Sequence, residues 1–244
     1  MRQVQLLIDA DPICYRAASS AETEMEFTQD VTVVVGDFRR GKDIVRQEIR
    51  DLMQRFDTKL GTLYFTGESN FRKDVDPTYK GNRIKRKPAG YKKLKNWCLH
   101  TYKSRIEDVL EADDLLGIEA TSGMYAPFVV VSPDKDLKQI PGRHYNGKTE
   151  FDVTPEEGEK FFWIQTLCGD PTDGYKGVPG IGEKRAKALL DAVEDGNYWE
   201  AVLQAFLDAD LTEEDALRTC RLAKILTSKY WDSDRGYTLW SPDS

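Results

Sequence analysis

Two continuous apolar runs, each followed by aspartates, constrain the fold more than any other feature of the sequence. Residues 4–8 (VQLLI) lead directly into Asp9, and residues 127–131 (PFVVV) lead into Ser-Pro-Asp. Strands that are apolar on both faces are typical of a parallel sheet that helices cover on both sides. Weaker patterns predict further strands at 31–35, 63–65 and 144–146.

Helical spacing of apolar residues predicts a helix over about 41–59, a second over 91–102 and a third that begins near Ala112. Beyond Thr154, which carries the pattern of a helix N-cap, the predicted elements are all helical. These helices are expected at 155–167, 183–193, 197–208 and 212–229. We therefore expect an α/β core over 1–153, with a twisted, mainly parallel central sheet flanked by helices, and a helical subdomain over 154–244.

The composition excludes several classes of protein. Of the 244 residues, 40% are hydrophobic and 32% are charged, which is typical of a globular protein without a membrane partner. The cysteines lie far apart at 14, 98, 168 and 220, so neither a zinc ribbon nor a dithiol redox site is indicated. Only two histidines are present, and no GxSxG motif suggests a serine nucleophile. We expect a cytoplasmic protein.

The charge distribution points to nucleic acid although the net charge is −7. Between residues 72 and 105 there are twelve Lys or Arg residues and only two acids, Asp74 and Asp76. Such a basic segment in an acidic chain is typical of a surface that follows a phosphate backbone. A solvated lysine-rich loop is the alternative interpretation.

Nine carboxylates are expected near one edge of the sheet, because ligands in open α/β sheets bind beyond the carboxyl ends of the strands. Like charges 4 Å apart repel by about 4 kcal/mol at an effective dielectric of 20, so cations are required. Oxygen ligands of this kind select Mg²⁺ or Mn²⁺, and two such ions can bind a scissile phosphate. Each cluster alone also fits turns or helix caps. The nine are Asp9, Asp11, Glu111, Asp113, Asp114, Asp134, Asp136, Asp170 and Asp173.

A glycine-rich turn at 177–182 (GVPGIG) precedes the predicted helix at 183–193. Glycines let a backbone approach a ligand closely, and a helix N-terminus offers unpaired N–H groups to a phosphate. The turn therefore indicates a phosphate-binding element next to Asp170 and Asp173.

Five stretches together resemble the 5′-nuclease superfamily of phage 5′→3′ exonucleases, flap endonucleases and the 5′-nuclease domain of bacterial DNA polymerase I. They are LLIDAD at 6–11, FRKDVDPTYKGNR at 71–83, LEADD at 110–114, VVVSPDKDL at 129–137 and GDPTDGYKGVPGIGEKRA at 169–186. The resemblance implies two metal sites, a basic helical arch at about 80–103 and a helix-three-turn-helix at about 170–192. Because the chain is small and has no polymerase domain, it most resembles a stand-alone phage enzyme of DNA replication.

The resemblance also implies roles for single residues. Asp9, Glu111, Asp113 and Asp114 resemble the ligands of a first metal, and Asp134, Asp136, Asp170 and Asp173 those of a second, with Asp113 shared. Tyr79, Lys80 and Arg83 resemble catalytic residues that stack a base and contact phosphate. DNA contacts are implied for Arg72, Lys85, Arg86, Lys87, Gly180, Gly182, Lys184 and Arg185, and K⁺ is a further candidate ligand at the helix-three-turn-helix.

The sequence departs from the family where many relatives have an aspartate after the third strand. This chain has Thr66, Gly67 and Glu68 there, so Glu68 or a water molecule is expected to take its place. Asp11 matches no family ligand and is expected to be structural.

The predicted function is a Mg²⁺- or Mn²⁺-dependent 5′→3′ DNA exonuclease that releases 5′-phosphate products. Expected substrates are duplex DNA with 5′ ends, nicks or flaps, with an RNA–DNA hybrid as a further candidate. The protein is expected to be a monomer, in the host cytoplasm if it is phage-encoded. A flap endonuclease or RNase H-like 5′-nuclease, a PIN-type ribonuclease and a non-catalytic DNA-binding relative remain alternatives.

Overall fold

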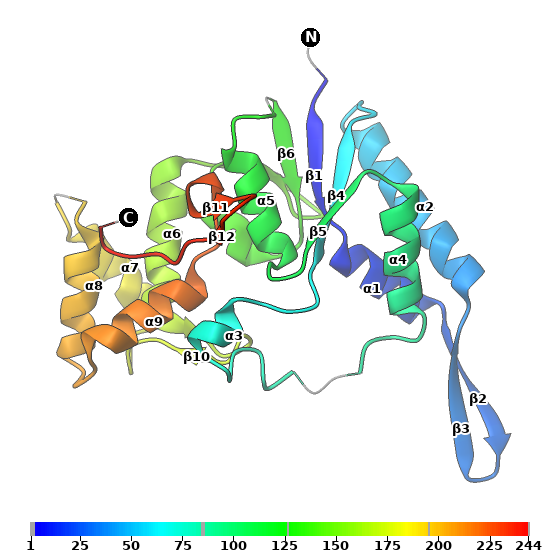
Figure 1. Ribbon diagram of the computed structural model, residues 1–244, viewed down its shortest axis with the longest axis horizontal. Coiled ribbons are helices and arrows are strands. Elements are labelled where there is room, and N and C mark those ends of the chain that lie inside the picture. The colour runs from blue at the N-terminus through cyan, green and yellow to red at the C-terminus, as the bar shows by residue number, and fades with distance from the viewer. Residues whose placement is uncertain (1–2, 84–85, 126, 195, 244) are drawn as a thin grey trace.

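One six-stranded sheet organises the molecule (Figure 1). The computed structural model describes residues 3–83, 86–125, 127–194 and 196–243. The strand order is β5–β4–β1–β6–β7–β8, in which only β8 runs antiparallel to its neighbour. The strands are β1 (Gln5–Asp9), β4 (Gly61–Thr66), β5 (Ser104–Glu107), β6 (Phe128–Val131), β7 (Gly142–Tyr145) and β8 (Glu150–Val153). The mainly parallel sheet is confirmed, while the short, half-polar strands β5 and β8 were not predicted.

Helices cover both faces of the sheet because successive residues of its strands point to opposite sides. Leu6 and Ile8 of β1 lie in a core that the helices α1 (Asp11–Ser20), α2 (Phe38–Arg55) and α4 (Tyr91–Thr101) complete. Leu7 points the other way, into a core formed with α5 (Ala112–Thr121) and α6 (Pro155–Cys168). The fully apolar run of β1 is therefore explained by burial on both faces.

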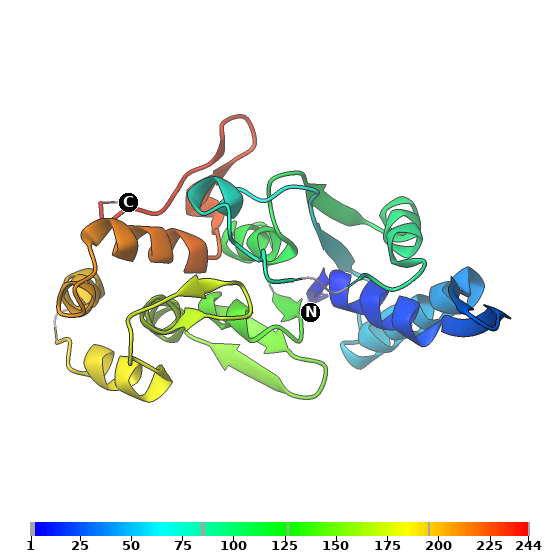
Figure 2. The ribbon, with the colours of Figure 1, turned by 90° about the horizontal axis from the view of Figure 1, so that it is seen from below.

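The part of the chain after α6 lies at one end of the molecule and is mainly helical (Figure 2). The helices α7 (Glu183–Asp191) and α8 (Tyr198–Leu207) match the prediction, but α9 (Glu213–Ala223) ends six residues early. Short strand pairs interrupt the helices. They are β9 (Gly169–Asp170) with β10 (Tyr175–Lys176), and β11 (Trp231–Asp232) with β12 (Gly236–Tyr237). Among the described residues, no helix is long and apolar enough to span a membrane.

The strand predicted at 31–35 does not belong to the central sheet. It is β3 (Val31–Gly36), and it pairs antiparallel with β2 (Glu22–Thr28) in a hairpin that projects from the molecule (Figures 1 and 2). Glutamate at every second position of β2 cannot be buried, and this keeps the hairpin out of the core.

The second half of the helical arch predicted at 80–103 is helical, but its packing does not support an arch. The helix α4 packs on the core through Tyr91, Leu94 and Cys98, which are all buried. Between α3 (Arg72–Val75) and α4, the described residues contain turns and irregular backbone but no helix. Of the predicted arch, the described residues before α4 are therefore the part that does not pack on this core as a helix.

A buried ion pair joins the sheet core to the C-terminal helices. The Arg72 guanidinium donates to both carboxylate oxygens of Asp114, at 2.7 and 2.8 Å, and to the carbonyls of Leu222 and Lys224. The carboxylate of Asp114 also accepts the backbone N–H of Leu226. Arg72 is 3% exposed and Asp114 is fully buried. This pairing and burial do not support Arg72 as a DNA contact or Asp114 as a metal ligand.

We expect Arg72→Ala to lower the free energy of unfolding by about 3–5 kcal/mol, because it leaves the Asp114 carboxylate buried without its partner. Urea unfolding followed by circular dichroism measures this change. Lys187→Ala, which removes the exposed pair with Glu183, is the control and should cost less than about 1 kcal/mol. An equal effect of the two substitutions would contradict the structural role of Arg72.

Candidate metal centre

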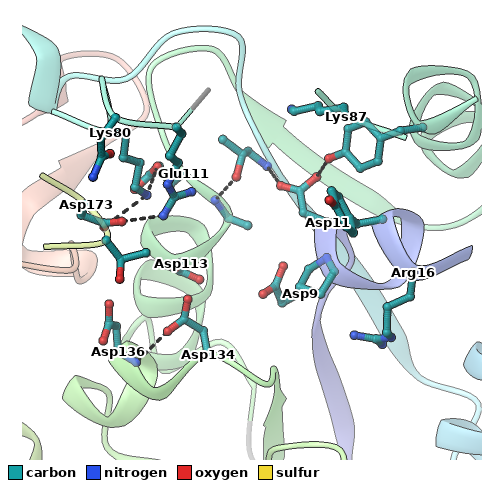
Figure 3. Close-up of a pocket in the computed structure, with 18 residues that line it drawn as sticks. Asp9, Asp11, Arg16, Lys80, Lys87, Glu111, Asp113, Asp134, Asp136 and Asp173 are labelled. Carbon is teal, nitrogen blue, oxygen red and sulfur yellow. Dashed lines mark hydrogen bonds and ion pairs between the residues drawn. The ribbon is translucent and has the colours of Figure 1, made fainter. Parts of the chain in front are cut away.

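A cavity of about 810 Å³ opens at the carboxyl edge of the sheet, and acidic side chains from four parts of the chain face it (Figure 3). Seven of the nine predicted carboxylates line this cavity. They are Asp9, Asp11, Glu111, Asp113, Asp134, Asp136 and Asp173. The convergence expected from the parallel sheet is thus present, while Asp114 and Asp170 lie outside the lining.

Asp9, the last residue of β1, lies at the floor of the cavity. Its Oδ2 accepts a hydrogen bond of 2.8 Å from Ser132, which follows the neighbouring strand β6. Its Oδ1 is buried and has no hydrogen-bond partner among the described residues. Burial, together with the nearby charges of Asp11 and Asp134, raises the pKa of Asp9 to about 7. A buried carboxylate oxygen without a donor is a ready ligand for a cation.

Asp113 and Asp136 share this shortage of positive charge. Burial, followed by repulsion from Asp9 and Asp134, raises the pKa of Asp113 well above its usual range. Burial and the charge of Asp134 raise the pKa of Asp136 to about 6. Like Asp9, Asp136 has a buried Oδ1 with no hydrogen-bond partner in the described part of the chain. These three side chains form the half of the cavity whose negative charge is not compensated.

Basic side chains balance the other half of the cavity. The ammonium of Lys80 lies 2.5 Å from Glu111 and 3.4 Å from Asp173, and the Arg83 guanidinium lies 2.5 Å from Asp173. Burial alone would raise the pKa of Glu111, but the charges of Lys80 and Arg72 outweigh it and lower that pKa. The hydroxyl of Tyr79 lies 3.1 Å from Glu111 and 3.0 Å from Asp173.

The backbone of residues 78–83 is fixed against the loop that carries Asp173. Lys80 has a positive φ of 55°, and its N–H donates to the carbonyl of Asp173 at 2.7 Å. The Asn82 amide donates to the carbonyl of Pro171 at 2.8 Å. Residues about 90 positions apart in the sequence are thereby held at one side of the cavity.

Asp170 shapes this loop and does not face the cavity. Its Oδ1 accepts the backbone N–H groups of Thr172 and Asp173, which is a turn-forming role. Gly169 and Gly177 lie so close across the β9–β10 pair that a Cβ on Gly169 would meet the Gly177 nitrogen at 2.2 Å. The prediction of Asp170 as a metal ligand is therefore not supported by its position.

Tyr79 is 3% exposed, so its ring cannot stack a base as predicted. The cavity offers another aromatic side chain, Tyr15 of α1, which is 44% exposed and lies in its wall beside Arg16 and Lys87. Tyr15 is not among the residues predicted from the sequence. Its position one helical turn beyond Asp11 is the signal that could have found it.

The expected substitute for the missing aspartate, Glu68, is exposed and does not line the cavity. A side chain at Gly67 is excluded, because its Cβ would lie 2.1 Å from the carbonyl oxygen of Glu107. Asp11 lies nearby instead, where it accepts the Thr66 N–H at 2.9 Å and the Tyr91 hydroxyl at 2.6 Å. This network supports the structural role expected for Asp11, because it ties α1 to β4 and α4.

The predicted DNA contacts lie on two surfaces. Lys87 lines the cavity with its ammonium over the Tyr91 ring, and Arg86 pairs with Glu22 at the base of the hairpin. Lys85 lies outside the described residues. The second surface is the turn before α7, where the backbone and basic side chains are exposed. Its predicted residues are Gly180, Gly182, Lys184 and Arg185.

Gly180 has a φ of +76°, which requires glycine, and its carbonyl accepts the Arg185 guanidinium at 2.9 Å. Gly182 is the N-cap of α7, and a Cβ there would meet nothing within 4 Å. The start of α7 is therefore accessible to a phosphate group.

The cavity residues fit divalent cations by their chemistry. All donors are carboxylate oxygens, and the unpartnered oxygens of Asp9 and Asp136 face a region with too little positive charge. Within the described ranges, no three acidic, histidine or cysteine side chains are yet close enough to enclose an ion.

Comparisons with known proteins agree with this geometry, although no family model matches the sequence. The exodeoxyribonuclease of Enterobacteria phage T3 is 27% identical over 98% of this chain and 93% of its own length. The exonuclease of Escherichia phage T7 is also 27% identical, over 97% and 93%. DNA polymerase I of Bacillus subtilis is 31% identical over 70% of this chain but only 22% of its own length.

Among solved structures, a variant of the 5′-exonuclease of phage T5 is similar with a TM-score of 0.65 and 18% identity, over 94% of this chain and 90% of that chain. This likeness shows that the chain has the α/β fold with a C-terminal helical part that is seen in that structure. The two phage exonucleases and DNA polymerase I, which are similar in sequence, support placing the chain in the 5′-nuclease superfamily.

We expect divalent metal ions to bind more tightly as the pH rises from about 5 to about 8, because the carboxyls with pKa values of about 7 (Asp9) and about 6 (Asp136) must lose protons first. Both pKa values lie above the unfolded value, so without metal these groups favour folding at acid pH and lose that contribution as the pH rises. MgCl₂ should therefore raise Tm more at pH 7.5 than at pH 5.5. Equal shifts at both pH values would contradict the prediction.

Proposed function

We propose that the protein is a metal-dependent 5′→3′ DNA nuclease that hydrolyses phosphodiesters to 5′-phosphate products. The observation that carries this proposal is the division of one cavity into two halves. One half is rich in uncompensated carboxylates, and the other presents Lys80 and Arg83. A phosphodiester needs both, since metal ions must meet its oxygens while fixed cations stabilise its developing charge.

Asp9, Asp113, Asp134 and Asp136 are the residues that would hold the ions, with Glu111 and Asp173 at the basic side. Mg²⁺ or Mn²⁺ suits these oxygen donors, and we propose two ions. When bound, such ions neutralise phosphate oxygens and make a water molecule nucleophilic at neutral pH. A structure of the T5 flap endonuclease with DNA and metal ions supports this assignment by fold.

The protein's own cations position the phosphate. Lys80 and Arg83 lie at the mouth of the basic half, where they can leave their carboxylate partners and donate to phosphate oxygens. Tyr79 is a positioning residue, because its buried hydroxyl lies between Glu111 and Asp173. On the opposite wall, Tyr15 can stack the terminal base while Arg16 and Lys87 contact the strand.

The duplex is held away from the cavity, at the turn before α7. Gly180, Gly182, Lys184 and Arg185 would contact its backbone, and K⁺ is a candidate ion between the turn and a DNA phosphate. We propose residues 154–244 as the part that grips duplex DNA and residues 1–153 as the part that cleaves it. An RNA–DNA hybrid is a further candidate substrate.

Exonuclease and flap endonuclease modes differ in product length. Nicked, blunt and 5′-flapped duplexes, labelled at the 5′ end or internally and incubated with Mg²⁺, distinguish them. We expect mononucleotides and short oligonucleotides from the 5′ end of nicked and blunt duplexes. Cleavage only at the base of flaps would assign the endonuclease mode, and the absence of cleavage with every divalent metal would overturn the proposal.

We expect Asp134→Asn to abolish cleavage while duplex binding in Ca²⁺ remains, because the amide keeps the shape of the side chain but loses its charge. Steady-state cleavage and fluorescence anisotropy measure the two properties. Glu68→Gln is the matched control, since Glu68 is an exposed acid outside the cavity, and it should keep wild-type activity. Full activity in Asp134→Asn would contradict the metal-site assignment.

We expect Lys80→Ala to lower the cleavage rate by roughly 10²-fold at saturating DNA, the usual cost of losing one stabilising donor. Tyr79→Phe, which removes only the hydroxyl between Glu111 and Asp173, should raise the Mg²⁺ concentration needed for half-maximal rate with a smaller loss at saturating Mg²⁺. Single-turnover rates over a Mg²⁺ titration test both. A large loss in Tyr79→Phe at saturating Mg²⁺ would show a direct role of the hydroxyl.

A further inference from the structure

The β2–β3 hairpin presents an apolar face that nothing in the described chain covers. Alternation along the strands places the same kind of side chain on one side of both strands. We call this the hairpin face, and it consists of Thr23, Met25, Thr28, Val31, Val33 and Val35, with Phe27 at the bulge between Glu26 and Thr28. Phe27 is 79% exposed and Met25 57%, and the three valines are each at least 40% exposed.

The opposite side of the hairpin is chemically different. Glu22, Glu24 and Glu26 alternate with the apolar residues of β2 and lie on the other side, across from Val34 and Thr32 of β3. Glu24 and Glu26 are exposed and form no ion pair within the described ranges. The hairpin therefore has two chemically different sides, with Met25, Val31, Val33 and Val35 on one and Glu22, Glu24 and Glu26 on the other.

An apolar face of this kind is unusual on the surface of a protein. Contiguous exposed apolar patches mark interaction sites, and a two-stranded ribbon with free edges adds backbone groups that can pair with another chain. A two-stranded hairpin is also barely stable alone in water. Its base is fixed to the core, but its outer half needs a further surface.

We propose that the hairpin face binds the hairpin face of a second copy of this chain, forming a symmetric dimer. Three features favour a second copy over DNA or a basic protein. The face carries no charge and is self-complementary, the glutamates point away from it, and DNA would be repelled by three glutamates on so thin an element. The hairpin also projects from the body, so two copies can meet without a clash of their cores (Figure 1).

The size of the face is compatible with a small interface. Phe27 and the four large side chains of the face each expose on the order of 100 Å², so two copies bury about 1,000 Å² in total, at the lower limit of specific interfaces. Because area alone does not set affinity, the test covers a wide range of concentration. This proposal replaces the expectation of a monomer, and it does not depend on the nuclease activity.

The base of the hairpin connects this face to the cavity. The Glu22 carboxylate accepts the Arg86 guanidinium at 2.6 Å and the backbone N–H of Ala89. Gly36, at the end of β3, lies so close that a Cβ there would meet the Ala89 carbonyl oxygen at 2.5 Å. Ala89 and Arg86 belong to the segment that carries Lys87 into the cavity wall. A dimer thus fixes one end of the path that we assign to the DNA strand.

Sedimentation velocity of the full chain from about 1 to 300 µM tests the proposal. We expect wild-type protein to pass from monomer to dimer, and the change from about 50 to 500 mM NaCl to strengthen association, because the contact is apolar and each chain carries a charge of −7. Met25→Thr with Val33→Thr, a cross-strand pair on the hairpin face, should weaken association about tenfold or more.

Val34→Thr is the matched control, because it makes the same change in the same strand on the glutamate side, and it should leave association unchanged. Val33→Cys should give an oxidant-dependent covalent dimer, while Val34→Cys and wild-type protein should not, since residues near a two-fold axis meet their own copies. Monomeric wild-type protein at every concentration would overturn the proposal. So would equal effects of the two threonine changes, or a loss of duplex binding in Met25→Thr/Val33→Thr without any change of mass.

Discussion

Mutual repulsion among carboxylates at the carboxyl edge of the sheet is the constraint to which the rest of the structure responds. Lys80 and Arg83 compensate Glu111 and Asp173, and the Lys80 N–H, at a residue with positive φ, donates to the Asp173 carbonyl. Among the described residues Asp9, Asp113 and Asp136 have no ion-pair partner, and burial, reinforced by the charges of neighbouring carboxylates, raises their pKa values. The negative charge on one side of the cavity is therefore balanced by the protein's own cations. On the other side it is balanced only when cations bind.

The two sides of the cavity come from different parts of the chain, so their relative position depends on the contacts between those parts. The buried Arg72–Asp114 pair fixes α3 and α5 to the carbonyls that follow α9. Asp11 joins the start of α1 to β4 and α4. The Arg72–Asp114 pair and Asp11 are charged, yet their role is structural. Their charged atoms are already paired or hydrogen-bonded within the protein and so are not available to a ligand.

The carboxylates and the cations of the cavity stand on different kinds of backbone. The carboxylates stand on strand ends and helix starts, whereas Lys80, Arg83 and the wall residue Lys87 lie between α3 and α4, where the described residues form no helix. Asn82 bonds to the loop at 170–174, and Arg86 pairs with Glu22 at the base of the β2–β3 hairpin. In the function and the dimer that we propose, these contacts would link substrate positioning to the helices that grip the duplex and to a second copy of the chain.

The sequence by itself determined the class of fold and the edge on which the acids gather, because fully apolar strands must be buried on both faces and their carboxyl ends meet at one edge. It also placed Asp9, Asp113 and Asp136 correctly at the cavity. Tertiary structure alone decided which polar side chains are available to a ligand, since a motif shows residue types but not their partners. Arg72, Asp114 and Tyr79 match the motif, but each is buried inside the protein. It likewise decided that Val31–Gly36 lies outside the central sheet, because three of the seven residues of its pairing partner β2 are glutamates.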